Sequence, residues 1–449
     1  MIARAPVRLA AAALAAFLAL APRGAAEEPA PAPAPAPAPA RKETAILLRN
    51  ATVLTMAGDP IPEGGVLLRE GKIASVGRAL PAPEGATVVD CTGRFVVPGF
   101  IDAGTRVGLV DIDLVKAAND SDEGSEPSTP DLDVRDGINI ESPLFGITRS
   151  RGVTTVLVHP QDSNVINGRG GIFHCLDGAP IPERTVLAPS GLHVSLGGPP
   201  KERFAEKDKL PSTRMGVASV LRSEFARAQE YREKKRRYEE KRQARKEGEP
   251  EPEPPALDPR LEVLTRALAR EIPVFARAER LDDIRTALRI GEEFNLRVVL
   301  FGATESWKMA RELAERKVPV VLGPVVAQPD SPERPGARMD AARLLHEAGV
   351  LFCLMTGDAH NARNLPHQAG IAASWGLPES EALAAITRNA ARVLGVQETL
   401  GTIESGKEGT LCVFQGSPLE PLSRLERMFV RGKEITLRNR QTELLEKWK

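Results

Sequence analysis

The stretch FVVPGFIDAGTRVG, from Phe95 to Gly108, decides the fold of this 449-residue chain. A short apolar strand leads into a Pro-Gly pair, and a second apolar strand, Phe100-Ile101-Asp102, then runs into small and polar residues. Proline and glycine interrupt regular structure, so the pair marks a break between two strands. The pattern of the chain differs on the two sides of this break.

Short apolar runs dominate the chain before the break and return near its end. ILLRNATVLTM and GGVLLREGKIASVG precede the break, and GTLCVFQG and LERMFVRGKEI follow residue 400. Runs of this kind, separated by Gly, Asp and Pro turns, predict β-strands. Between them, apolar strands such as Gly152–Pro160 and Ile272–Glu279 alternate with helical stretches, which is typical of a parallel α/β barrel.

These stretches resemble the amidohydrolase superfamily, in particular its imidazolonepropionase-related group. The Pro-Gly-Phe-Ile-Asp segment resembles the point where that family enters its barrel, and GTIESGKEGTLCVF followed by RGK resembles the family's ending. The resemblance implies a (β/α)8 TIM barrel over residues 99–399. It also implies a small discontinuous β-sandwich built from residues 44–98 and 400–436. The implied activity is hydrolysis of a C–N bond in a linear or cyclic amide, with a divalent metal such as zinc.

The resemblance also shows where metal-ligating side chains would lie, and this chain lacks them. The expected ligand positions hold Gly104, Arg106, Arg277, Glu279 and Gly302. Glycine has no side-chain ligand, and an arginine guanidinium stays cationic and cannot ligate a metal. No metal is therefore expected at this place, and zinc would require a non-standard site.

The chain retains one carboxylate near the family's last metal-pocket position. Asp358 stands one residue beyond the expected place and is the candidate catalytic residue. We expect Arg106 and Arg277 to lie at the C-terminal mouth of the barrel and to face Glu279 or Asp358 in place of a metal. Arginine and carboxylate side chains form strong charge-assisted pairs, so such a network could maintain the pocket.

Three further residues are candidates for the pocket. His159 ends an apolar strand, and His360 lies two residues after Asp358, just beyond another apolar strand. Arg169 lies in the glycine-rich segment Ser163–Phe173, which is expected as a loop at the pocket mouth. A rebuilt metal site from His159, His360 and Asp358 remains an alternative, although no histidines show H-x-H or i,i+4 spacing.

Two functions follow from this pattern. The first is a metal-free pseudoenzyme that binds a small ligand or a partner subunit, either a second copy of the chain or an active paralogue. The alternative is an active hydrolase of non-peptide C–N bonds with a rebuilt or metal-independent site. The 60 basic and 60 acidic residues balance, so the composition gives no indication of nucleic-acid binding.

The two ends of the chain and one internal segment are expected to lie outside the barrel. Residues 1–26 have the basic start, apolar run and small-residue end of a signal peptide, which predicts export to the periplasm or outside the cell. No membrane span is expected after cleavage, and a retained anchor is the alternative. Residues 27–43 are a stiff Pro/Ala-rich linker. Residues 217–258 form a charged helical insertion, and residues 437–449 form a charged tail. The four cysteines lack metal-ligand spacing and are expected as buried free thiols.

Overall fold

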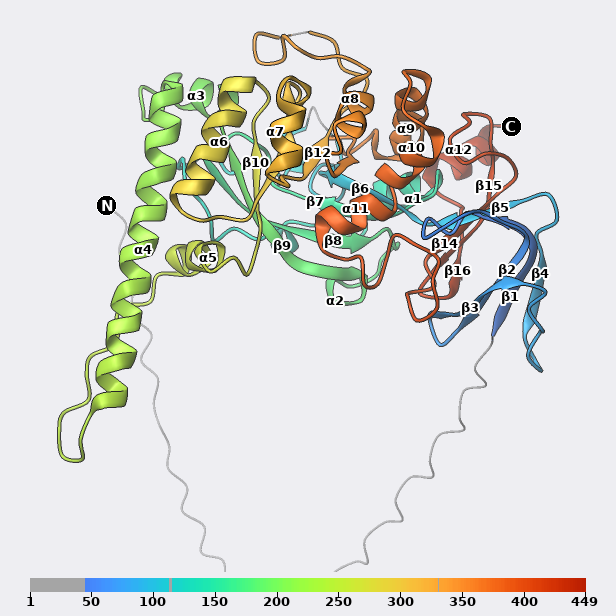
Figure 1. Ribbon diagram of the computed structural model, residues 1–449, viewed down its shortest axis with the longest axis horizontal. Coiled ribbons are helices and arrows are strands. Elements are labelled where there is room, and N and C mark those ends of the chain that lie inside the picture. The colour runs from blue at the N-terminus through green and yellow to red at the C-terminus, as the bar shows by residue number, and fades with distance from the viewer. Residues whose placement is uncertain (1–44, 113–114, 330) are drawn as a thin grey trace, which may run out of the picture. The chain divides into compact units, whose positions relative to one another are not determined.

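The computed structural model describes residues 45–112, 115–329 and 331–449, which belong to one compact unit (Figure 1). The expected signal peptide, residues 1–26, and the linker, residues 27–43, lie outside the described residues. No helix in the described ranges is long and apolar enough to cross a bilayer. Two eight-stranded sheets organise this part of the chain.

The first sheet contains strands from both ends of the described chain. Its members are β1 (Ile46–Val53), β2 (Ile61–Arg69), β3 (Lys72–Arg78), β4 (Thr87–Asp90), β5 (Phe95–Pro98), β14 (Leu411–Phe414), β15 (Leu425–Val430) and β16 (Lys433–Ile435). Strand β14 runs antiparallel to β5, with Cys412 opposite Val97. The hydrogen bonds join all eight strands in one sheet, which has its own core with Leu48 and Phe429 among its members. The N- and C-terminal strands thus share one sheet domain.

The second sheet forms a TIM-like barrel whose strands follow chain order. They are β6 (Phe100–Thr105), β7 (Val153–Val158), β8 (Ile166–His174), β9 (Thr185–Ser195), β10 (Val274–Arg277), β11 (Val298–Gly302), β12 (Val320–Leu322) and β13 (Phe352–Leu354). Strand β8 runs antiparallel to β7 and β9, whereas the other seven strands run parallel. The expectation of eight parallel strands in a (β/α)8 alternation is therefore wrong at β8. Short connections flank β8, and they leave no room for the crossover that parallel neighbours require.

The glycine-rich segment Ser163–Phe173, expected as a loop, mostly forms strand β8. A Cβ atom on Gly170 would lie 2.6 Å from Nε2 of His193 and 3.0 Å from the carbonyl oxygen of Val158. A glycine inside a strand often marks such a close approach of neighbouring groups. The glycine therefore allows tight packing between strands rather than a mobile loop.

The barrel closes between β13 and β6 through a buried carboxylate instead of a β-ladder. Asp102 in β6 accepts hydrogen bonds from the backbone N–H of Thr356 at 3.1 Å and from its hydroxyl at 2.5 Å. The backbone N–H of Gly357 donates to the carbonyl oxygen of Gly104 at 2.9 Å. These bonds hold the first and last strands together at the C-terminal end of the barrel.

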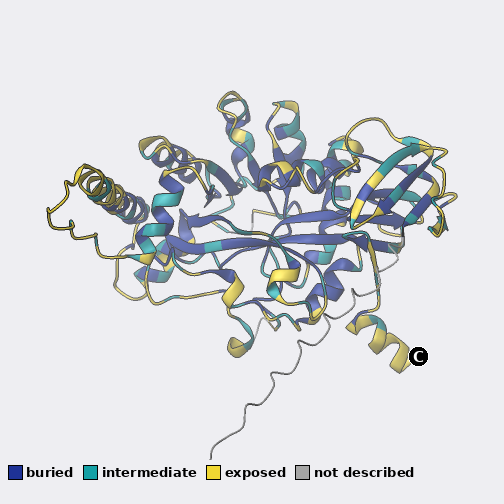
Figure 2. Ribbon diagram, turned by 90° about the horizontal axis from the view of Figure 1, so that it is seen from below, coloured by how far each residue is buried: buried dark blue, intermediate teal, exposed yellow. Residues whose placement is uncertain are grey.

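Helices surround the barrel sheet, and burial is greatest in its strands (Figure 2). They are α1 (Pro143–Arg149), α2 (Ile181–Arg184), α3 (Gly198–Ala205), α4 (Arg214–Ala244), α5 (Pro259–Leu268), α6 (Leu281–Glu293), α7 (Ala310–Glu315), α8 (Ala341–Glu347), α9 (Leu365–Ser374), α10 (Glu379–Ala385) and α11 (Arg388–Leu394). Residues 378–394 form two short helices because the chain breaks after α10. At that break the carbonyl oxygen of Ile386 accepts a hydrogen bond from the N–H of Ile101 in β6.

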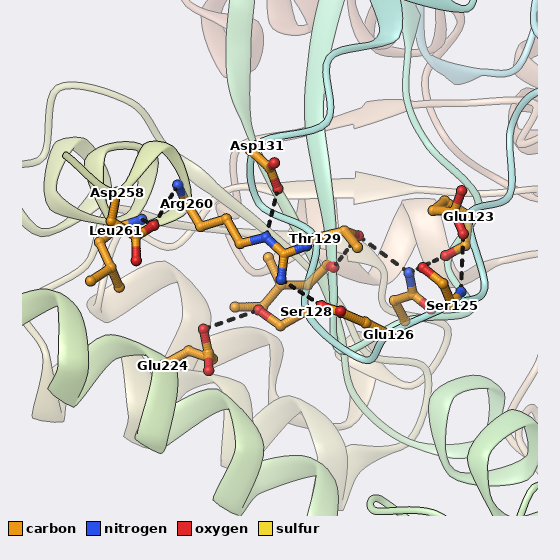
Figure 3. Close-up of polar contacts among 12 residues, drawn as sticks. Glu123, Ser125, Glu126, Ser128, Thr129, Asp131, Glu224, Asp258, Arg260 and Leu261 are labelled. Carbon is orange, nitrogen blue, oxygen red and sulfur yellow. Dashed lines mark hydrogen bonds and ion pairs between the residues drawn. The ribbon is translucent and has the colours of Figure 1, made fainter. Parts of the chain in front are cut away.

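The charged insertion contains α4, a helix of 31 residues. Its first half buries Leu221, Phe225 and Tyr231, whereas its second half is largely exposed and extends away from the barrel (Figures 1 and 2). Figure 3 shows how α4 and α5 hold a segment that precedes α1. The hydroxyl of Ser128 donates to Glu224 at 3.2 Å, and Arg260 pairs with Glu126 and Asp131. The insertion is therefore anchored at its base.

The predicted charged tail, residues 437–449, contains helix α12 (Arg440–Trp448), which begins with a capping box formed by Asn439 and Thr442. The four cysteines are free and buried, as expected: Cys91, Cys175, Cys353 and Cys412. Burial raises the pKa of the Cys91 thiol to about 11, so this side chain stays protonated at neutral pH.

Candidate functional site

The expected ligand positions gather at the C-terminal ends of the barrel strands. Gly104 and Arg106 lie at the end of β6, Arg277 ends β10, Gly302 ends β11, and Asp358 follows β13. Side chains at these ends approach one another because the strands are parallel. This end of the barrel is therefore the candidate site.

The two glycines at this end lie where no larger side chain fits. A Cβ atom on Gly104 would lie 2.6 Å from Cζ of Phe301 and 2.7 Å from Sδ of Met355. Gly302 has φ +75°, and a Cβ atom there would lie 2.5 Å from Oε1 of Glu279. Neighbouring side chains thus occupy the space that two histidine ligands would need.

An aromatic stack fills the barrel interior below these positions. The rings of His159 and His193 stack with their centroids 5.2 Å apart, and His193 stacks on Phe275 at 4.9 Å. Phe301 meets the edge of His159 at 4.8 Å. Both histidines are almost completely buried. They therefore belong to the packed core at the base of the site.

Both imidazoles are neutral. Burial, followed by the charges of Arg106 and Arg277, lowers the pKa of His159 to about 3, and burial lowers that of His193 well below its ordinary value. Nδ1 of His159 lies 2.7 Å from the carbonyl oxygen of Pro160, so we assign the proton to Nδ1. Nε2 of each ring is buried and has no hydrogen-bond partner among the described residues.

These two free nitrogens do not form a metal site of the kind the family uses. The ring planes lie within 14° of parallel, and an imidazole binds a metal close to its own plane, so the two rings cannot converge on one ion. Within the described ranges, no three His, Cys, Asp or Glu side chains form a group that could hold a metal. The residues at this end of the barrel do not fit the family's metal.

Arg277 forms the centre of an ion-pair cluster at the barrel end. Its Nη2 lies 2.6 Å from Oε1 of Glu279, and its Nη1 lies 3.1 Å from Oδ2 of Asp162. Glu279 also accepts hydrogen bonds from the hydroxyl and the backbone N–H of Thr304. Burial lowers the pKa of Arg277, but the two carboxylates more than offset this effect, and the net pKa is raised. The guanidinium is held charged between two acids.

Arg106 and Asp358 lie near each other without direct pairing. Arg106 has no ion-pair partner among the residues that the structure describes. Burial raises the pKa of Asp358, but hydrogen bonds from Asn361 and His360 and the charge of Arg106 lower it by more. Asp358 is therefore a carboxylate at neutral pH.

Two of the candidate pocket residues are engaged elsewhere. Nη2 of Arg169 donates to the carbonyl oxygen of Asp131 at 2.9 Å and lies 3.4 Å from Oδ2 of Asp133. Nε2 of His360 lies 3.0 Å from the carbonyl oxygen of Asp111. The backbone N–H of His360 donates to Oδ1 of Asp358 at 2.7 Å, so His360 contacts Asp358 through its main chain.

Asp162, Thr304 and Asp102 were not among the predicted site residues, although all three contribute to this end of the barrel. Asp162 follows β7, which ends at Val158, and Thr304 follows β11, which ends at Gly302. Polar residues directly after an apolar barrel strand are a usable signal for such positions. Which of them meet, however, depends on contacts between strands distant in sequence.

Comparisons with known proteins agree with this architecture. The model of the amidohydrolase family matches residues 278–436. The crystal structure of an amidohydrolase from Thermotoga maritima MSB8 is 35% identical with a TM-score of 0.81, and the match covers 88% of this chain and 100% of that chain. At 88% of the chain, this match is longer than the barrel and so includes part of the sheet domain as well.

Two further relatives are more distant. Amidohydrolase tasK from Hapsidospora irregularis is 24% identical over 407 residues, which is 83% of this chain, and the chain spans only 41% of the length of that relative. The zinc-bound structure of an adenosine deaminase from Xanthomonas campestris is 15% identical with a TM-score of 0.53, over 90% of this chain and 96% of that chain. The latter shows similarity of fold alone.

Proposed function

The chain belongs to the amidohydrolase superfamily, whose members hydrolyse C–N bonds, and we propose that it is a metal-free pseudoenzyme that binds a small carboxylate ligand. The observation that carries the proposal is the Arg277 cluster. A guanidinium, paired with Glu279 and Asp162, lies where the family resemblance implies metal ligands. It supplies positive charge but no exchangeable coordination position for water.

The neighbouring Arg106 supports a binding role. Its guanidinium lacks an ion-pair partner within the described ranges and lies close enough to Asp358 to lower the pKa of that carboxyl. Arginine binds a carboxylate through two parallel hydrogen bonds. A ligand carboxylate is therefore the natural partner for Arg106 at the barrel mouth.

A second candidate is hydrolysis without a metal, with Asp358 as general base. The observation in its favour is the lowered pKa of Asp358, which keeps a free carboxylate at the mouth. A general base also needs a positioned water and a stabilised leaving group. The cluster around Arg277 is internally paired and offers neither, so we rank this candidate second.

Titration calorimetry with short carboxylates, alongside hydrolysis assays on linear and cyclic amides, tests the proposal. We expect saturable carboxylate binding that weakens about tenfold or more in Arg106→Gln, because a charge-assisted pair is lost. The exposed Arg285→Gln on α6 is the matched control and should bind normally. Amide hydrolysis that is lost in Asp358→Asn would favour the second candidate and contradict the pseudoenzyme proposal.

The proposal extends to location and partners. The leader-like residues 1–26 and the linker 27–43 support export to the periplasm or beyond the cell, with the folded part as a soluble body. A pseudoenzyme commonly acts through a partner, so a second copy of the chain or an active paralogue is proposed as well. Fractionation of the source cells and mass measurement of the purified protein test both points.

A further inference from the structure

The opposite end of the barrel carries a cavity of about 900 Å³. Pro273, Val318 and Leu351, which precede β10, β12 and β13, contribute to its walls. The cavity therefore lies at the N-terminal ends of the barrel strands, away from the Arg277 cluster. In barrel enzymes this end ordinarily serves stability rather than catalysis.

Positive charge dominates the lining of this basal cavity. Two acidic residues, Glu271 and Glu292, face six basic ones: Arg266, Arg270, Arg297, Arg316, Lys317 and Arg392. Ion pairs satisfy two of the basic residues, because Arg266 lies 3.2 Å from Glu271 and Arg316 lies 2.6 Å from Glu292. The acids of the cavity are thereby used, and outside the cavity Glu404 lies close enough to Arg392 for that charge to lower the pKa of the Glu404 carboxyl.

Three of the remaining cations have no ion-pair partner among the described residues: Arg297, Lys317 and Arg392. Burial, followed by the charge of Arg270, lowers the pKa of Arg297. Arg270 itself donates to the carbonyl oxygen of Asn295 at 3.2 Å. Arg297 is thus a partly desolvated cation beside another cation, and this arrangement is unfavourable unless an anion joins it.

The helix dipole explains only part of this charge. Arg392 lies in the last turn of α11, where a cation stabilises the negative helix end. Arg297 lies in the connection between α6 and β11, outside any helix. Its position therefore needs a different explanation.

The walls behind the cations are apolar and contain one unsatisfied hydroxyl. Ile272 and Leu296 are buried lining residues. Oγ of Ser190 in β9 is buried, has no hydrogen-bond partner in the described part of the chain, and lines the cavity. A cavity with apolar walls and a few polar groups is the usual form of a small-molecule site.

We propose that this basal cavity is a second binding site, for a small organic anion with an apolar body and a carboxylate or phosphate group. The apolar walls receive the body of the ligand. Arg297, Lys317 and Arg392 bind its charged group, since guanidinium and ammonium groups bind carboxylates and phosphates alike.

Titration of the full chain with benzoate, phenyl phosphate and neutral benzyl alcohol tests this site. We expect saturable binding of at least one anion and none of benzyl alcohol, and the stronger anion identifies the charged group. Arg297→Gln and Arg392→Gln should each weaken binding about tenfold or more. Arg311→Gln is the matched control, because Arg311 is exposed on α7 and does not line the cavity.

Binding that weakens in Arg297→Gln and Arg392→Gln places the anion in the basal cavity, whereas binding that weakens only in Arg106→Gln places it at the barrel mouth and overturns the proposal. The proposal is overturned if neither anion binds saturably or if benzyl alcohol binds as well as the anions. It is also overturned if folded Arg297→Gln and Arg392→Gln variants, verified by circular dichroism, bind as tightly as the parent protein.

Discussion

Arg277 carries a permanent charge into the barrel end where the family resemblance implies metal ligands. The side chain is 19% exposed, and the two carboxylates beside it, Glu279 and Asp162, are 9% and 11% exposed. Charges this far from water depend on each other, because removal of one leaves the others without compensation. The cluster is therefore coupled to the stability of the fold.

Arg277→Ala should lower the free energy of unfolding by about 3 kcal/mol, since two carboxylates would then face each other unpaired. Glu279→Ala should lower the free energy of unfolding by a smaller amount, because Arg277 keeps Asp162 as an ion-pair partner. Urea denaturation measures both, and the exposed Arg285→Ala on α6 should change stability by no more than about 0.5 kcal/mol. Equal stability of Arg277→Ala and the parent protein would show that the cluster faces solvent.

Asp102 makes stability depend on pH. Burial raises the pKa of this carboxyl from 3.8 to about 7, despite hydrogen bonds from Thr356 and Gly104 that lower it. The folded state therefore favours the protonated form. The resulting stability is fully present below about pH 4 and is lost as pH rises through about 7, at no more than about 1.4 kcal/mol per pH unit.

Asp102→Asn should remove this dependence, because the amide does not titrate and its oxygen can still accept hydrogen bonds. Denaturation of both proteins between pH 4 and pH 8 is the measurement. The parent protein should lose stability relative to the variant as the pH rises. Parallel curves for the two proteins would contradict the buried, protonated state of Asp102.

Part of the candidate site could be predicted from the sequence, because strand alternation places Arg277 and Glu279 on one face. The structure pairs these two residues. The third member, Asp162, comes from a different strand end, and no local pattern links it to Arg277. The buried contact of His159 with His193 could not be predicted from the sequence either, since it arises from packing across the barrel.

Among the elements, α4 combines a packed base with an exposed end. Phe225 is completely buried, whereas Glu233, Arg236 and Glu240 form ion pairs on the outer half. Exposed pairs three or four residues apart contribute only about 0.3–0.5 kcal/mol each. The outer half should therefore be dispensable for folding.

Replacement of residues 237–256 by a short Gly/Ser linker should leave the thermal midpoint nearly unchanged. The ends lie close enough for this linker, because Lys235 pairs with Glu262 at 2.7 Å. Phe225→Ala in the base should instead cost about 3–5 kcal/mol, as for other buried aromatic residues. A large loss of stability in the linker variant would show that the outer half packs on the folded body.

The elements also show where sequence patterns fail. The alternation of apolar strands and helical stretches predicted a parallel barrel, and seven of its eight strands run parallel. The sequence did not predict strand β8, because Gly168, Gly170 and Gly171 suggest a loop. In the structure, neighbouring atoms lie so close to these three residues that only glycine fits there. Local propensity alone would also allow one helix over residues 378–394, but this segment is divided into α10 and α11, and at the break the carbonyl oxygen of Ile386 accepts a hydrogen bond from the N–H of Ile101 in β6. Both differences come from tertiary contacts that outweigh local propensity.

The stability of the whole molecule depends on the pairing of strands from the two ends of the described chain. Strand β14 lies between β5 and β15, and its Leu411 and Val413 lie in the core of the sheet domain. Removal of this strand would expose both that core and a long strand edge.

Deletion of all residues after Leu400 should therefore make the protein insoluble. Deletion after Arg438, which removes only α12, should not, because α12 buries none of its residues. Expression of both truncations and measurement of their soluble fractions test this expectation. A soluble, folded protein that ends at Leu400 would contradict the shared sheet.

If charged and aromatic side chains stand in place of the metal that the family resemblance implies, the purified protein should bind none. Elemental analysis of protein purified without chelators, and again after incubation with zinc and removal of free ions, measures this. We expect no stoichiometric zinc, iron or manganese in either sample. One tightly bound metal ion per chain that is lost on His159→Ala, His193→Ala or Asp358→Asn would contradict it.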